Sequence, residues 1–153
     1  MNKLLHLRPL WMLILYIIVD TLCIGMGMGV PFFCILFGFI VGWFIANAIT
    51  LTLVDVAQVF QKVLKYSILT SAFTLLGMII LWVPFARYLF DPTMDLANTG
   101  IPMILYEPQA SFIGWIVLMV LISPFLQLLT TLFGAYLALI VWIKKVPHDQ
   151  KAV

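Results

Sequence analysis

The sequence has very few charged residues. Asp, Glu, Lys and Arg make up only 9% of its 153 residues, whereas 65% of the residues are hydrophobic. A water-soluble domain needs a far larger charged surface, so this composition excludes one. The few charges form short clusters between long uncharged runs. Hydrocarbon offers backbone N–H and C=O groups no water partner, so each long run is predicted to form a membrane-spanning helix.

Residues that carry common chemistry are also scarce. The chain has two His and two Cys, and it contains no nucleotide-binding loop, metal-binding motif or catalytic triad. Asp20 is the only acid well inside an uncharged run, so the paired membrane aspartates of an intramembrane hydrolase are missing. A net charge of +2 is too small to predict a nucleic-acid partner. We therefore expect a protein that is not an enzyme, has no cofactor and has the lipid bilayer as its main partner.

The uncharged runs predict four crossings, since each crossing takes about 20 apolar residues. The expected fold is an all-α polytopic integral membrane protein, with four transmembrane helices arranged as two antiparallel hairpins. Residues 1–153 are expected to form a single transmembrane domain. The predicted helices cover about 10–28, 32–50, 53–84 and 109–143, with an outer loop at about 87–109.

Local sequence features predict where these helices begin, end and bend. The Gly-rich segment 25–31 breaks the first run and predicts a tight turn. Thr52 followed by Asp55 is typical of a capping box, which predicts the start of the third helix. Pro84 is expected to end or kink that helix, and Pro124 to kink the fourth.

The basic residues predict the orientation in the membrane. If the amino terminus lies in the cytoplasm, seven of the eight Lys and Arg residues fall on the cytoplasmic side and only Arg87 falls outside. This bias predicts cytoplasmic N and C termini in a multi-pass protein of a bacterial inner membrane. A cleaved signal peptide is not expected, because no small-x-small site follows the first apolar run.

Asp20 is the leading candidate for a functional residue. A carboxylate inside a membrane span costs about 2.5 to 3.5 kcal/mol on insertion scales. Three interpretations remain open: a protonated acid bonded to a neighbouring helix, a group that handles a proton, a cation or a polar substrate, or an acid wetted at the outer turn. Thr74, Ser123 and Gln127 are predicted at a similar depth and are the expected partners of a polar intramembrane site.

A stripe of small residues marks the second helix. Gly38, Gly42 and Ala46 recur every four residues, so one face of the helix allows another backbone to approach closely. The partner is either another helix of the same chain or a second copy of it.

Four sulfur-bearing residues surround the Gly-rich turn. Cys23 and Cys34 flank the turn, with Met26 and Met28 between them. The two cysteines allow a disulfide at an oxidising outer face. Thiols and thioethers together are also the ligand set that selects Cu(I). Free buried thiols that behave as small apolar side chains are the simplest interpretation.

Three functional hypotheses follow. The first is a small transporter, channel-like protein or accessory subunit with a polar site at Asp20, working beside a second copy of itself or a larger membrane partner. The second is a structural or assembly protein whose polar groups only hold helices together. The third is an outer-face module for soft-metal binding or thiol redox chemistry.

Overall fold

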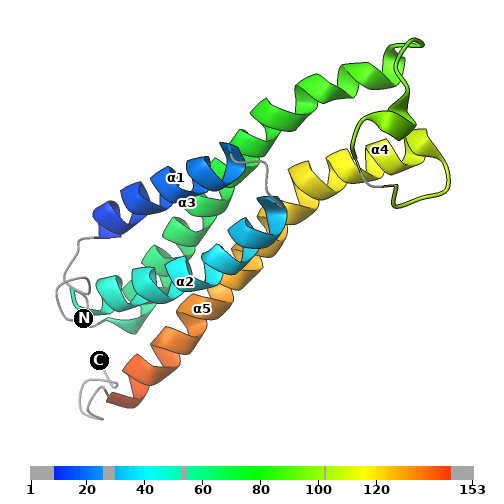
Figure 1. Ribbon diagram of the computed structural model, residues 1–153. Coiled ribbons are helices and arrows are strands. Elements are labelled where there is room, and N and C mark those ends of the chain that lie inside the picture. Colours follow the sequence, from blue (N-terminus) through cyan, green and yellow to red (C-terminus); the bar gives the residue numbers. More distant parts are fainter. Residues whose placement is uncertain (1–8, 26–29, 53–54, 102, 146–153) are drawn as a thin grey trace.

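The structure is a computed structural model that describes residues 9–25, 30–52, 55–101 and 103–145 (Figure 1). These residues form helices joined by turns, and no strand occurs among them. The all-α prediction is therefore confirmed for the described residues. The elements are α1 (Pro9–Gly25), α2 (Val30–Thr50), α3 (Val56–Trp82), η2 (Val83–Phe90), η3 (Leu96–Asn98), α4 (Pro108–Val117), η4 (Leu118–Ile122) and α5 (Ser123–Lys145).

Three helical stretches are long and apolar enough to cross a membrane: Phe32–Thr50, Val56–Phe90 and Pro108–Lys144. The first helix, α1, contributes a shorter apolar stretch, Leu13–Cys23. Large apolar side chains cover the outside of the bundle, and Leu22, Phe32 and Ile80 each remain at least 60% exposed. Such a surface fits a lipid environment, because water would disfavour so large an apolar area.

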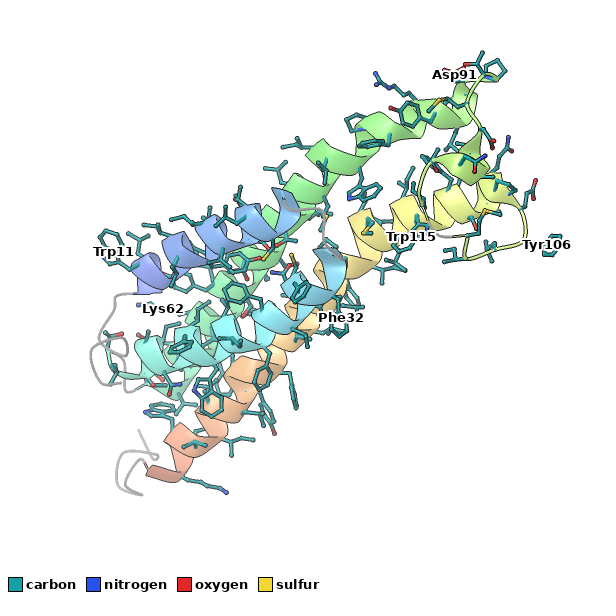
Figure 2. All side chains as sticks on the ribbon, viewed as in Figure 1. Trp11, Phe32, Lys62, Asp91, Tyr106 and Trp115 are labelled. Atoms are coloured by element: carbon teal, nitrogen blue, oxygen red, sulfur yellow. The ribbon has the colours of Figure 1, made fainter. Side chains whose placement is uncertain are left out.

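The helices form two long rods and one shorter pair. One rod is α3 with η2, and the other is α4, η4 and α5 in continuous succession (Figure 1). The shorter helices α1 and α2 cover only the part of the rods away from α4. The start of α1 and the end of α5 lie at the same end of the bundle. Figure 2 shows Trp11 and Lys62 toward that end, with Asp91 and Tyr106 at the opposite end.

The small-residue stripe of α2 packs against α5 of the same chain. A Cβ atom on Gly42 would lie only 1.9 Å from the carbonyl oxygen of Thr131, and one on Gly38 only 2.7 Å from the Thr130 hydroxyl. In return, a Cβ on Gly134 of α5 would lie 2.1 Å from the carbonyl oxygen of Phe39. Ala46 is fully buried further along. Backbone-to-backbone contact at these glycines makes α2 and α5 the most extensively packed pair of helices.

The start of α3 differs from the prediction. Asp55 is the N-cap, and its carboxylate accepts a hydrogen bond of 3.0 Å from the Ala57 amide. The predicted cap, Thr52, instead donates its hydroxyl to the carbonyl oxygen of Ile49 at 3.0 Å. The predicted capping box at Thr52 is therefore wrong, because the Thr52 hydroxyl donates to a carbonyl oxygen that the end of α2 leaves without a helical partner.

The helix changes its type at Pro84 and before Pro124, and these changes accommodate the two prolines. After Trp82 the chain continues as the 3₁₀ helix η2, with Pro84 in its first turn, a position that proline tolerates. The helical rod therefore reaches Phe90 and extends into the predicted outer loop. Before Pro124 the rod widens into the π-helical segment η4. A proline ring clashes with the carbonyl group four residues earlier, here that of Val120, and the wider turn relieves that clash.

Candidate functional site

Tyr16 and Asp20 stand one turn apart on α1 and point into the bundle. Tyr16 is 1% exposed and Asp20 is 0% exposed. Residues four apart share a helix face, so the ring and the carboxyl group meet α3 and α5 together. The Tyr16 ring also stacks on Phe37 of α2, with ring centroids 5.9 Å apart. Helix α1 therefore places an acid and a phenol at the centre of the helices.

A chain of hydrogen bonds joins these two residues to α3 and α5. Thr74 Oγ1 donates to Asp20 Oδ2 at 2.7 Å. Tyr16 and Thr74 share a hydrogen bond of 2.5 Å, in which the phenol is the donor when the threonine proton is on Asp20. Gln127 Nε2 in turn donates to the phenol oxygen. We call these four residues, Tyr16, Asp20, Thr74 and Gln127, the polar cluster.

Two oxygen atoms of the polar cluster have no hydrogen-bond partner among the described residues. They are Asp20 Oδ1 and Gln127 Oε1. A buried oxygen that lacks a donor costs free energy, so each favours a cation or a donor group. Both atoms are acceptors, and therefore the cluster is suited to a proton or cation and unsuited to an anion.

The depth of the cluster follows from its position along α3. Thr74 is nine residues beyond Lys65, or about 14 Å at the α-helical rise, and at least about 20 Å before Arg87. No Lys, Arg or His occurs in the described helices between these levels. Asp20 therefore lies near the middle of the apolar zone with no basic residue to pair with.

The structure brings three of the four predicted site residues together. Asp20, Thr74 and Gln127 belong to one hydrogen-bonded chain. Ser123 is 1% exposed and lies one turn before Gln127 on α5, but its hydroxyl has no partner among the described residues. Tyr16, which the sequence analysis did not name, is the residue that links Gln127 to Thr74.

Other hydroxyl groups near the cluster serve the backbone. Ser71 Oγ donates to the Pro124 carbonyl oxygen at 2.7 Å, and Thr131 Oγ1 donates to the Gln127 carbonyl oxygen at 2.7 Å. Thr130 Oγ1 bonds to the Ile35 carbonyl oxygen at 2.6 Å, which ties α5 to α2. Ser71 and Thr130 therefore hold helices together and Thr131 bonds within α5, whereas the polar cluster retains unused acceptors.

Both cysteines are free thiols. Cys34 is 1% exposed and lies beside the Asp20 carboxyl group, close enough for a charge on one to act on the other. Cys34 also packs against Met78, with Cys23 and Trp82 around the pair. Cys23, Cys34 and Met78 are called the sulfur cluster below. Met26 and Met28, the two other predicted sulfur ligands, lie outside the described residues.

The loop beyond η2 has its own polar contacts. Asp91 accepts hydrogen bonds from the Thr93 amide at 2.9 Å and the Thr93 hydroxyl at 2.6 Å. These two bonds lower the pKa of the Asp91 carboxyl group, because they stabilise its charged form. Asp95 caps η3 in the same manner, through the Ala97 amide. The loop carboxylates are thus satisfied locally and stand apart from the polar cluster.

Comparison with known proteins identifies no relative, since no family model, curated protein or solved structure shows significant similarity to this chain.

Proposed function

We propose that this chain is a small multi-pass transporter or channel-like subunit of a bacterial inner membrane. Its polar cluster takes up a proton or a small cation within the membrane, and Asp20 is the group that binds it. The protein acts alone or beside a larger membrane partner, and it performs no covalent chemistry.

One observation carries this proposal. A fully buried carboxyl group lies in the middle of the apolar zone, with one oxygen unpartnered among the described residues and no basic residue nearby. Acidic residues at such depth are costly, and they commonly mark ion pathways and proton relays. A group with purely structural duties would be expected to use both of its oxygens.

The hydrogen-bond chain supports proton movement. Thr74 donates to Asp20 Oδ2 and Gln127 donates to the phenol of Tyr16. The phenol itself has two acceptors within reach, the Thr74 hydroxyl and the Thr70 carbonyl oxygen at 3.3 Å. The two hydroxyl groups can each pass on a proton while accepting another, so protonation of Asp20 is able to reverse the direction of their bonds. The neutral and the charged states of Asp20 therefore correspond to two arrangements of the same chain.

The arrangement of the helix ends supports cytoplasmic termini. The start of α1 and the end of α5 lie at one end of the bundle (Figure 1), which fits an even number of crossings. Lys62, Lys65 and Lys144 belong to helix ends at that side, whereas Arg87 is the only described basic residue toward the other. The positive-inside rule then assigns the Lys-rich end to the cytoplasm.

Proton uptake into liposomes tests the proposal. The purified protein is reconstituted with an internal pH-sensitive dye, and a potassium diffusion potential, negative inside, drives cations inward. We expect wild-type vesicles to acidify faster than protein-free vesicles, and Asp20→Asn vesicles to match the protein-free rate. Asn keeps the size of Asp and still accepts from Thr74, but it cannot take up a proton.

Asp55→Asn is the matched control. Asp55 is an exposed acid at the start of α3, and Asn serves equally well as an N-cap. This variant is expected to acidify like the wild type. The proposal is wrong if Asp20→Asn vesicles acidify as fast as wild-type vesicles. It is also wrong if wild-type vesicles acidify no faster than protein-free vesicles.

A structural or assembly role is the second candidate. The polar cluster ties α1, α3 and α5 to one another, and such bonds also serve helix association. On this hypothesis Asp20→Asn changes the stability of the bundle, and the wild type and the variant both show only the background ion flux of protein-free vesicles. Unfolding in detergent, measured beside the flux assay, separates the two.

A further inference from the structure

The sulfur cluster brings together side chains from three helices. Cys23 comes from α1, Cys34 from α2 and Met78 from α3. Cys34 and Met78 are 1% and 0% exposed, and Cys23 is half-buried against them. The cluster is one turn further along than the polar cluster, since Met78 follows Thr74 by four residues. Two thiols and a thioether from three separate helices thus pack together inside the bundle.

The chemistry of these donors selects one class of ligand. Two thiols and a thioether favour a soft cation such as Cu⁺, whereas hard cations need several oxygen ligands. Within the described ranges, no three His, Cys, Asp or Glu side chains lie close enough to hold a metal ion, which argues against a zinc or calcium site here. The thioether of Met78 is the third donor that completes a soft set.

Trp82 packs against the sulfur cluster. An aromatic ring attracts cations, and tryptophan is the most effective of the aromatic side chains. The surroundings of the three sulfur atoms therefore suit a positive charge.

We propose that Cys23, Cys34 and Met78 form a binding site for a soft monovalent cation, Cu⁺ or Ag⁺. The proposal rests on the proposed function, because it names the class of cation that the membrane site handles. It replaces the expected pairing of the cysteines with Met26 and Met28 by a donor set that includes Met78.

Proton release to the solvent balances the binding step. When the cation binds Cys34, the S–H bond breaks, a metal–sulfur bond forms and the thiol proton goes to the solvent. The thiolate neutralises the cation, so binding adds no net charge to the site. No electron is transferred, and Cys23 binds as a neutral thiol.

Titration with Ag⁺ under anaerobic, reducing-agent-free conditions tests the site. Silver cannot oxidise the thiols to a disulfide through a redox cycle, so binding is measured alone, by calorimetry of the protein in detergent. We expect saturable binding of about one Ag⁺ per chain, with an affinity that falls about tenfold or more in Cys34→Ser and in Met78→Leu. Met119→Leu is the matched control, since Met119 is a buried methionine of η4 that does not belong to the sulfur cluster.

Leucine nearly conserves the volume of methionine, so Met78→Leu is expected to fold even if Cys34→Ser does not. Size-exclusion chromatography and circular dichroism check the folding of each variant. The proposal is overturned if the wild type binds no Ag⁺ with saturation, or if Met78→Leu binds it as tightly as Met119→Leu.

Proton release during the same titration tests the thiolate bond. We expect the wild type to release about one proton for each Ag⁺ that binds. Saturable Ag⁺ binding without proton release overturns the assignment of Cys34 as a thiolate ligand. If the wild type binds no Ag⁺ but still acidifies vesicles through Asp20, the metal site alone is wrong. If it binds Ag⁺ but does not acidify vesicles, the transport function alone is wrong.

Discussion

Substitution of Gly42 by alanine tests how closely α2 and α5 are packed. The added Cβ would lie 1.9 Å from the Thr131 carbonyl oxygen, whereas ordinary contact begins at 3.4 Å. The obstacle is helix backbone, which cannot rotate aside as a side chain does. The two helices must therefore separate by 3.4 minus 1.9, or about 1.5 Å, at this level.

The separation also breaks a hydrogen bond between the helices. The bond from Thr130 Oγ1 to the Ile35 carbonyl oxygen is 2.6 Å long, and an added 1.5 Å takes it to about 4.1 Å, beyond bonding distance. Overpacking costs about 1 to 3 kcal/mol, and a lost interhelical bond in a membrane averages about 0.6 kcal/mol. We therefore expect Gly42→Ala to lower the free energy of unfolding by about 2 to 4 kcal/mol.

Unfolding in mixed micelles with increasing SDS, followed by tryptophan fluorescence, measures this difference. Gly114→Ala is the control, because the Cβ there meets only the flexible side chain of Ile104, whose Cδ1 atom lies at 3.0 Å. That side chain can turn away, and we expect a change below about 1 kcal/mol. If Gly42→Ala unfolds at the same SDS fraction as the wild type, α2 and α5 are not packed as described.

Three further predictions follow. Thr74→Val keeps the shape of the side chain but removes the hydroxyl that donates to Asp20. It should lower the free energy of unfolding by about 1 to 3 kcal/mol in the same assay. Thr74→Ser keeps the hydroxyl and should not show this loss. Thr93→Val should raise the pKa of Asp91 in a carboxyl NMR titration, because the hydroxyl bond is lost. In the wild type, the stabilisation of the loop by these bonds is complete above the ordinary pKa of Asp and is lost as the pH falls through the lowered pKa of Asp91. An unchanged Asp91 pKa in Thr93→Val contradicts this prediction. Reporter fusions at the two chain ends should both report the cytoplasm, and opposite sides would refute the orientation.

The sequence predicts the helices well because hydrocarbon permits little else. Uncharged runs bounded by charges had to become helices, and a lone acid at position 20 had to be buried or wetted. Tyr16 could have been found by the same reasoning. It precedes Asp20 by one turn, and a phenol deep in an apolar run needs a partner for its hydroxyl.

The sulfur cluster could not be predicted, because its geometry depends on the register between helices. Met78 resembles any other apolar residue of α3, and only its level relative to Cys23 and Cys34 makes it a neighbour. The misplaced cap has a local cause, since Thr52 and Asp55 both have suitable side chains. The choice between them depends on where α2 ends, which the sequence leaves open.

The widened turn at η4 has a consequence for the whole of the last rod. A π-helical turn accommodates one more residue than an α-helical turn, so the residues after it are rotated by about 100° relative to an uninterrupted helix. Gln127 and Gly134 both follow this offset. The direction in which they face, one toward Tyr16 and the other toward α2, is thus set by a single extra residue several positions earlier in the chain.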